Sequence, residues 1–149
     1  MLAAPSRLRG RLANYYLYFS QHGGDGIWLA VSEQVEGPWR VLPTPVLTLQ
    51  ATGYTDHIAS PDVLVDGERG EVRMYFHAGD GTELAQQRQC VAVSRDGVAF
   101  DVVARDIGTP YLRVLKHAGW WHALVVPGTL LRFSTSMIPT SRAMSQPAS

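Results

Sequence analysis

The chain reads VRMYFH at Val72–His77 and CVAVS at Cys90–Ser94, followed by the pair Asp96-Gly97 and then Phe100. Aromatic and β-branched residues at this density are typical of β-strands. The Asp-Gly pair is a strong hairpin signal, because glycine tolerates the positive φ that tight turns require. These segments predict an antiparallel meander in which a bulky aromatic residue begins the last strand.

The same order of segments occurs elsewhere in the chain. An earlier copy reads YYLYFS at Tyr15–Ser20 and IWLAVS at Ile27–Ser32, and then Gly37-Pro38-Trp39. A later copy begins with GWWHAL at Gly119–Leu124 and is shorter. A repeat of roughly 55–60 residues that carries several short strands is typical of β-propeller blades. The chain is therefore predicted to be all-β, with about two and a half blades built as four-stranded antiparallel sheets.

The complete repeat runs from about Ile58 to Ala104. Helical periodicity is absent, and the polar segment Thr82–Gln89 is predicted to be a long hairpin loop. The first 13 residues are predicted to be irregular, and the Ser-, Pro- and Thr-rich residues 134–149 a disordered tail. The predicted blades span residues 14–45, 58–104 and 111–133. The predicted strands of the last two are 58–65, 72–78, 89–94 and 100–104, and 111–116, 120–126 and 130–133.

Composition excludes several classes of function. The 149 residues include 13 basic and 13 acidic side chains, so the formal net charge is zero and a polyanion-binding protein is disfavoured. No apolar run approaches the roughly 20 residues needed to span a bilayer, and no secretory signal is recognisable. The single cysteine excludes a disulfide framework, and the histidines lack metal-ligand spacing. We expect a cytoplasmic protein without cofactor or metal, and without nucleic acid or membrane as partner.

The segment Tyr54–Val63, YTDHIASPDV, indicates which kind of β-propeller the chain resembles. Together with residues 74–77, 91–97 and 119–121, it resembles the five-bladed β-propeller glycoside hydrolases of the family 43 and family 32 type. The resemblance covers about Asn14 to Phe133. It implies a site at the innermost strands, where three carboxylates act on a glycoside through an oxocarbenium-like transition state.

One of those carboxylates has a counterpart here. Asp62 matches the second-blade aspartate that orients the substrate in that superfamily, although an aspartate near a strand end also commonly caps backbone amides. The first-blade acid has no counterpart, because residues 1–13 contain no Asp or Glu. The third-blade acid is also missing from Ile107–Pro110. Glu36-Gly37-Pro38 resembles its motif but is interpreted as an outer turn.

Further residues are candidates for substrate binding. Asp56 and His57 lie on the loop expected to lead into the innermost strand, where an ordinary polar turn is the alternative. Arg113 is placed on the third innermost strand, where it either grips hydroxyls or is simply solvated. Most aromatic side chains are expected to pack between blades. The complete set of predicted binding residues is Tyr54, Asp56, His57, Ser60, His77, Tyr111 and Arg113.

These observations leave three hypotheses open. The first is a glycosidase-like propeller that hydrolyses a small glycoside or oligosaccharide. The second is a non-catalytic carbohydrate-binding or interaction propeller, which the missing third-blade glutamate favours. The third is a truncated product without activity of its own. Because two and a half blades leave sheet faces uncovered, we also expect a homodimer formed through exposed blade faces.

Overall fold

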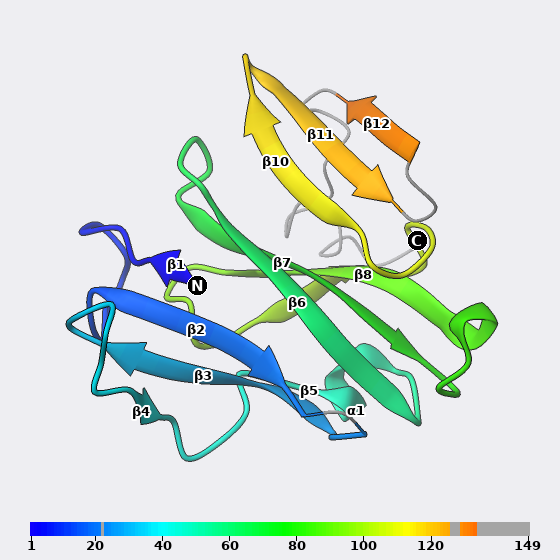
Figure 1. The fold of residues 1–149 in the computed structure, drawn as a ribbon, viewed down its shortest axis with the longest axis horizontal. Coiled ribbons are helices and arrows are strands. Elements are labelled where there is room, and N and C mark those ends of the chain that lie inside the picture. The colour runs from blue at the N-terminus through cyan, green and yellow to red at the C-terminus, as the bar shows by residue number, and fades with distance from the viewer. Residues whose placement is uncertain (22, 126–128, 134–149) are drawn as a thin grey trace, which may run out of the picture.

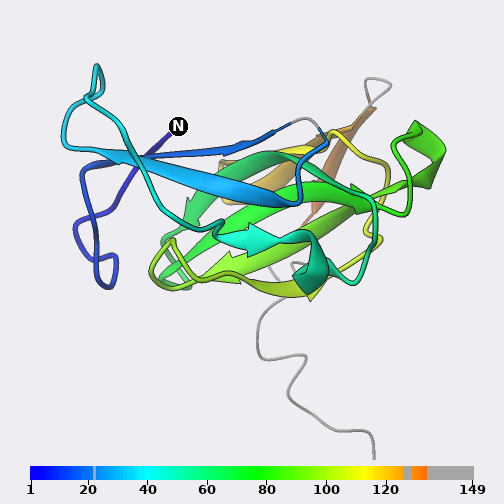
Figure 2. The same ribbon diagram turned by 90° about the horizontal axis from the view of Figure 1, so that it is seen from below.

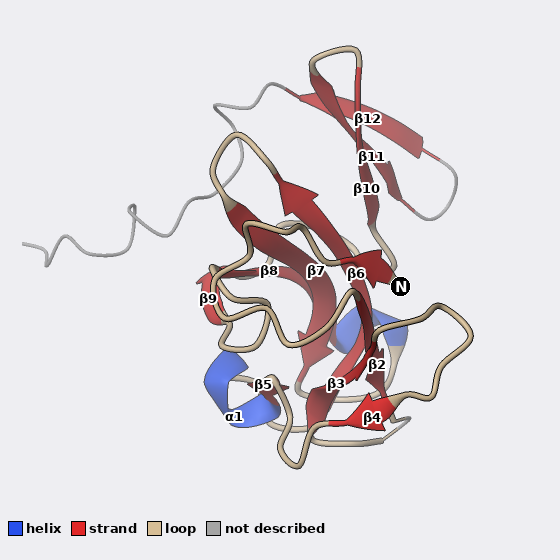
Figure 3. Ribbon diagram, turned by 90° about the vertical axis from the view of Figure 1, so that its left-hand side faces the viewer, coloured by secondary structure: helices blue, strands red, loops and turns tan. Residues whose placement is uncertain are grey.

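The structure is a computed structural model, and it describes residues 1–21, 23–125 and 129–133. Within these residues the fold is all-β (Figure 3), because strands make up the ordered elements apart from two short helical turns. No helix in the described part of the chain has the length and apolar character needed to cross a membrane. The predicted disordered tail, residues 134–149, lies outside the described residues.

The strands form three antiparallel sheets, which we call sheets A, B and C in chain order. Sheet B takes the middle position, with sheet A on one side and sheet C on the other (Figure 1, Figure 2). Strand β6 of sheet B contacts β2 and β3 of sheet A and β10 of sheet C. The described strands do not close into a single sheet.

Sheet B is the four-stranded meander that the complete repeat predicted. Its strands are β6 (His57–Asp66), β7 (Glu71–Gly79), β8 (Gln87–Ser94) and β9 (Asp101–Ala104), in that spatial order. Each predicted boundary lies within two residues of the observed one. The prediction of a loop over Thr82–Gln89 was wrong in part. Leu84–Gln86 form a 3-10 turn and β8 already begins at Gln87, because these residues pair with the end of β7.

Sheet A contains β1 (Leu2–Ala3), β2 (Tyr15–Ser20), β3 (Gly26–Ser32) and β4 (Arg40–Val41), while β5 (Leu47–Thr48) pairs with the start of β3. A single helical turn, α1 (Leu49–Thr52), follows. The prediction that residues 1–13 are irregular was wrong at Leu2–Ala3. These two residues pair with Tyr15 and Tyr16 at the edge of β2, which satisfies backbone groups that an open edge would expose.

Sheet C contains β10 (Arg113–His117), β11 (Trp120–Val125) and β12 (Thr129–Phe133). The predicted first strand began two residues earlier, at Tyr111. That residue has a φ of 64°, which is a left-handed conformation and is incompatible with an extended strand. Tyr111 therefore belongs to the connection that leads into sheet C.

Two apolar cores separate the sheets, and β7 contributes to both because its side chains alternate. Val72, Met74 and Phe76 face sheet A, where they pack with side chains such as Tyr16 and Ile27. On the opposite face, Tyr75 packs with Val91 and Val93 against Val114, Trp121 and Ala123 of sheet C. Sheet B is consequently covered on both faces.

A hydrogen bond between side chain and backbone also joins sheets A and B. The Tyr18 hydroxyl donates to the carbonyl oxygen of Gly97 at 2.7 Å, in the turn between β8 and β9. Burial raises the pKa of Tyr18, so this hydroxyl keeps its proton and remains a donor. Gly97 has a φ of 75°, and a side chain here would collide with the ring of Tyr16 and the hydroxyl of Tyr18. The glycine is thus required both by the turn and by the close approach of sheet A.

Candidate functional site

A β-bulge in β6 determines on which face of sheet B the Asp62 carboxylate lies. Ala59 pairs with His77 and Asp62 pairs with Tyr75, so Ser60 and Pro61 together oppose the single residue Phe76. Ser60 takes a φ of 53°, and its N–H donates to Ser20 Oγ at 3.3 Å. The extra residue shifts the alternation by one position. Asp62 therefore shares the face of Tyr75, which is the face turned toward sheet C.

Asp62 joins sheets B and C. Its Oδ2 accepts a hydrogen bond from the backbone N–H of Val114 at 2.8 Å. The side chain is half-buried, and it also lines a small hollow of about 120 Å³ beside Pro61, Leu2 and Tyr18. One oxygen therefore has the backbone-capping role that was the alternative interpretation of this residue. The other, Oδ1, accepts no hydrogen bond from the part of the chain that the structure describes.

A buried pair of histidines lies on the same face, near the other end of β6. His57 opens β6, and His77 lies on β7. Their rings stack with centroids 5.2 Å apart and planes inclined by 15°, and their Nε2 atoms are 3.2 Å apart. At this distance one Nε2 donates and the other accepts, so the contact holds a single proton. The expectation that His57 lies on a loop was wrong, because its backbone pairs with Gly79 at the end of β7.

The environment of the pair disfavours a positive charge. Burial, and then the neighbouring His57 ring and the Arg113 guanidinium, lowers the pKa of His77 to about 4. A buried imidazole loses hydration when it is charged, and a second cation nearby adds repulsion. His77 is therefore neutral at pH 7. It supplies a fixed polar surface and no charge.

Tyr111 packs against this pair from the connection before β10. Its ring meets the His77 ring edge-on, with centroids 4.7 Å apart and planes inclined by 67°. The tyrosine is 44% exposed, so one side of its ring faces solvent while the other is supported. Its positive φ is uncommon for a bulky residue, and such conformations are concentrated at functional sites.

Gln89 and Arg113 complete this group. Gln89 pairs with His77 across β7 and β8, and its Oε1 accepts a hydrogen bond from the Leu112 N–H at 3.3 Å. Gln89 was not among the predicted binding residues, although its alternation with Val91 and Val93 on β8 places it on the same face. Arg113 is exposed, and its Nη1 donates to the Leu112 carbonyl oxygen at 3.2 Å. We call the group formed by Asp62, His57, His77, Gln89, Tyr111 and Arg113 the B–C seam cluster.

Two predicted binding residues lie apart from this cluster. Tyr54 packs against the core between sheets A and B, and burial raises the pKa of its hydroxyl. Asp56 is exposed and its backbone N–H donates to the Gly79 carbonyl oxygen at 3.1 Å. Ser60 remains close to the cluster through the bulge that it forms, but its described hydrogen bond is directed to Ser20 of sheet A.

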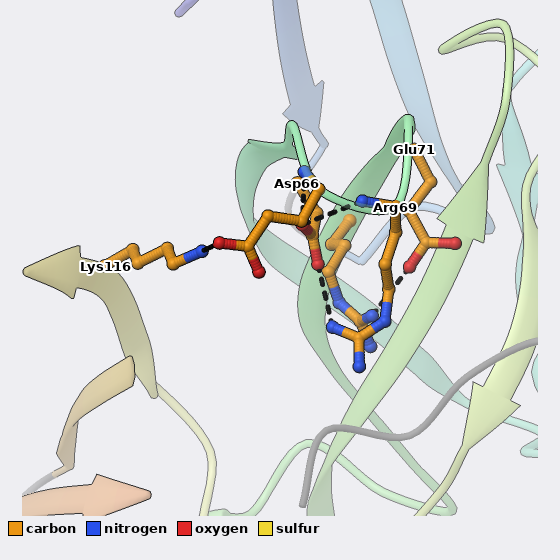
Figure 4. Close-up of polar contacts among 6 residues, drawn as sticks. Asp66, Arg69, Glu71 and Lys116 are labelled. Atoms are coloured by element: carbon orange, nitrogen blue, oxygen red, sulfur yellow. Dashed lines mark hydrogen bonds and ion pairs between the residues drawn. The ribbon is translucent and has the colours of Figure 1, made fainter. Parts of the chain in front are cut away.

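Three carboxylates of the β6–β7 hairpin are engaged in ion pairs at the far end of the seam (Figure 4). Asp66 Oδ2 contacts Arg69 Nη1 at 3.0 Å, and Glu71 Oε1 contacts Arg73 Nη1 at 2.7 Å. Glu68 pairs with Lys116 of β10. Arg73 is fully buried, so its charge requires the compensation to which Glu71 contributes. These acids hold the β6–β7 turn and β10 in place. Within residues 1–21, 23–125 and 129–133, no three His, Cys, Asp or Glu side chains form a group suited to a metal ion.

Comparison with known proteins gives one curated relative and no function. The chain is 33% identical over 134 residues to the uncharacterized protein R118 of Acanthamoeba polyphaga mimivirus. The match covers 83% of this chain and 38% of the viral protein, so the chain spans well under half of that relative's length. No family model matches the sequence, and no solved structure matches the fold.

Proposed function

We propose that this chain is part of a β-propeller related to the family 43 and family 32 glycosidases, and that its B–C seam cluster binds a small glycoside or oligosaccharide. The proposal is supported by a four-stranded meander with a sheet on either side, which is the arrangement of neighbouring blades. It is also supported by the position of Asp62 on β6, the predicted innermost strand.

The observation that carries the binding proposal is that the Tyr111 ring is both exposed to solvent and supported by the His77 ring. An exposed aromatic ring, fixed from behind by a buried His77 ring, provides a flat apolar surface at low entropic cost. Sugar rings present C–H groups on one face, and these pack well on such a surface. The positive φ of Tyr111 is maintained by its surroundings and costs about 1–3 kcal/mol, which is consistent with a functional role.

Polar groups of the B–C seam cluster would orient a bound sugar through hydrogen bonds. Asp62 Oδ1 is an acceptor for a sugar hydroxyl, while Oδ2 remains bonded to Val114. The exposed Arg113 guanidinium is a donor close enough to His77 to influence its pKa. An acceptor, a donor and a stacking ring on one seam are the minimum that a carbohydrate site requires.

Binding without hydrolysis is the version that the geometry favours. Glycoside hydrolysis requires two carboxyl groups on either side of the scissile bond, one as acid and one as base or nucleophile. Asp62 is the only acid of the cluster, and Asp66, Glu68 and Glu71 of the same hairpin are held in ion pairs. The proposed activity of these sheets is therefore binding of a glycoside without its hydrolysis.

The test is a titration of the purified chain with a panel of neutral mono- and oligosaccharides, followed by isothermal calorimetry and by NMR shifts. We expect binding by the wild type and about a two- to tenfold loss of affinity in Tyr111→Ala, because aromatic stacking contacts contribute about 0.5–1.5 kcal/mol. Val35→Ala truncates a side chain that is 42% exposed on the connection between β3 and β4 of sheet A, and it should bind like the wild type.

Two results would count against the proposal. Equal affinity of Tyr111→Ala and wild type would remove the seam from the binding site. Hydrolysis of an aryl-glycoside panel by this chain, abolished in Asp62→Asn, would replace the non-catalytic version with the catalytic one. Asparagine keeps an acceptor for the Val114 N–H, so this substitution removes the charge without removing the structural bond.

A further inference from the structure

A pocket lies between the 3-10 turn that precedes β8 and the connection between β9 and β10. Its volume is about 740 Å³, which is within the range of small-molecule sites in proteins. Leu84 and Ala85 line it from the 3-10 turn, and Gly108 and Pro110 line it from the connection. Much of its wall is therefore apolar. None of its described lining residues belongs to the B–C seam cluster, although Tyr111 follows Pro110 in the chain.

Hydrogen bonds hold both walls of the pocket in place. The Ile107 N–H donates to the Gln89 carbonyl oxygen at 2.9 Å, and the Gln89 N–H donates to the Gly108 carbonyl oxygen at 3.0 Å. The connection is thereby fixed along the edge of β8. On the other wall, Arg88 Nη1 donates to the Ala85 carbonyl oxygen of the 3-10 turn at 2.7 Å. A pocket with walls fixed in this way loses little conformational freedom when a ligand enters.

The charges that line the pocket offset each other. Arg88 and Asp106 are both lining residues, and Arg88 Nε lies 3.4 Å from Asp106 Oδ1. The described lining residues include no other charged side chain. Because these two charges sum to zero, the described part of the pocket has no net charge to attract an ion of either sign. The pocket therefore favours an uncharged ligand.

One polar group in the wall of the pocket lacks a hydrogen-bond partner. Gln87 is 5% exposed, and its Nε2 donates to the Thr82 carbonyl oxygen. Its Oε1 is buried and accepts no hydrogen bond from the residues that the structure describes. A buried acceptor without a donor is unfavourable. A hydroxyl or N–H group on a ligand in the pocket would supply the missing hydrogen bond.

We propose that this pocket binds a small, uncharged and mostly apolar molecule that donates one hydrogen bond to Gln87 Oε1. The apolar body of the ligand packs against Leu84, Ala85 and Pro110, and it covers Leu84, which is otherwise 57% exposed. A sugar fits this surface poorly, because most of its hydroxyls would be buried against apolar walls without partners. The pocket is thus a second site, and this inference does not depend on the sugar-binding proposal.

The experiment compares two probes, 2-naphthol and 2-methoxynaphthalene, in titrations of the purified full chain. Both probes are uncharged at neutral pH, and in the second a methyl group replaces the proton that the first donates. NMR shifts of the backbone amides give the affinity and the location of each probe. We expect shifts at residues 84–85 and 108–109, and about two- to tenfold tighter binding of 2-naphthol, as a single neutral hydrogen bond provides.

Three variants assign the contacts. Gln87→Leu removes the acceptor and keeps an apolar side chain, so the preference for 2-naphthol should disappear while the affinity for the ether is retained. Gln86→Leu makes the same change at an exposed neighbour that is not a described lining residue, and it should keep the preference. Leu84→Asn removes apolar contact and should weaken both probes to the same extent, by about threefold or more.

The same measurements can overturn the proposal. It would be wrong if neither probe shifted the pocket amides, or if Gln87→Leu kept the preference for 2-naphthol. Loss of both probes in Tyr111→Ala, with full binding in Leu84→Asn, would place them on the Tyr111 ring and also overturn it. Circular dichroism and thermal melts show whether each variant is folded. If Gln87→Leu does not fold, the wild-type preference and the variant at the exposed Leu84 decide the question.

Discussion

The seam between sheets A and B differs from the seam between sheets B and C. The A–B core is broad and almost wholly apolar, with Tyr16, Ile27, Met74 and Phe76 completely buried. The B–C core is smaller and has a polar group at each end: the stacked histidines at one, and the Asp66–Arg73 hairpin with its ion pairs at the other.

The difference indicates a division of labour between the two seams. An apolar interface between sheets stabilises the fold at any pH, because it contains little that titrates. An interface with buried polar groups depends on their protonation and on the hydrogen bonds that satisfy them. We therefore expect stability to depend mainly on the A–B seam, and ligand binding and pH response to depend on the B–C seam.

The largest effect is expected from Phe76→Ala in the A–B seam. Phe76 is fully buried, and removal of its ring leaves a cavity between two sheets that relax only in part. The free energy of unfolding should fall by about 3–5 kcal/mol, as measured by urea denaturation. Phe19→Ala, which removes a ring of β2 that is 36% exposed, should cost less than about 1 kcal/mol. A loss of similar size in both variants would show that the A–B core does not dominate stability.

The sequence predicted sheet B closely because its information is local. Alternation of side chains and the turn residues of Asp66–Gly70 and Asp96-Gly97 determine where strands start and stop. The edge strand Leu2–Ala3 was missed, since two residues carry no periodicity. The 3-10 turn at Leu84–Gln86 was missed for the same reason.

The site was predicted only in part because its geometry is not local. His57 and His77 meet across 20 residues, and Asp62 reaches Val114 across 52. The direction of Asp62 follows from a bulge whose register appears only once β6 and β7 are paired. Tyr54 seemed equivalent to Tyr111 in the sequence, yet it packs toward sheet A.

The second prediction concerns pH and tests the polar character of the B–C seam. His77 has a pKa of about 4 in the folded chain, against about 6.5 when unfolded. Between these values the unfolded chain binds more protons, so stability falls as the pH decreases from about 6.5 to about 4. This pKa difference adds about 3 kcal/mol to the free energy of unfolding above pH 6.5, relative to a pH well below 4.

His77→Phe isolates this contribution, because the ring remains and the titration is lost. Urea denaturation at a series of pH values should show a shallower loss of stability for His77→Phe than for the wild type between pH 6.5 and 4. His117→Asn removes an exposed histidine of sheet C and controls for the loss of one imidazole. Parallel curves for wild type and His77→Phe would mean that the histidine pair does not make the B–C seam sensitive to acid.

The smallest effect is expected at the single hydrogen bond that ties β10 to β6. Asp62→Ala leaves the N–H of the buried Val114 without its acceptor and should lower the free energy of unfolding by about 1–3 kcal/mol. Asp62→Asn keeps an acceptor oxygen at the same position and should cost less than the alanine variant by 1 kcal/mol or more.

The pair of variants separates the two roles of this carboxylate. If Asp62 acts only as a tether, Asp62→Asn will retain both stability and sugar affinity, because the Val114 bond is the whole of its contribution. If its second oxygen also receives a sugar hydroxyl, Asp62→Asn will retain stability and lose affinity, since an amide is a weaker acceptor than a carboxylate. Equal stability of the wild type, Asp62→Ala and Asp62→Asn would mean that the apolar contacts of Val114 and Trp121 hold sheet C without this hydrogen bond. The B–C seam would then resemble the A–B seam more closely than its polar ends indicate.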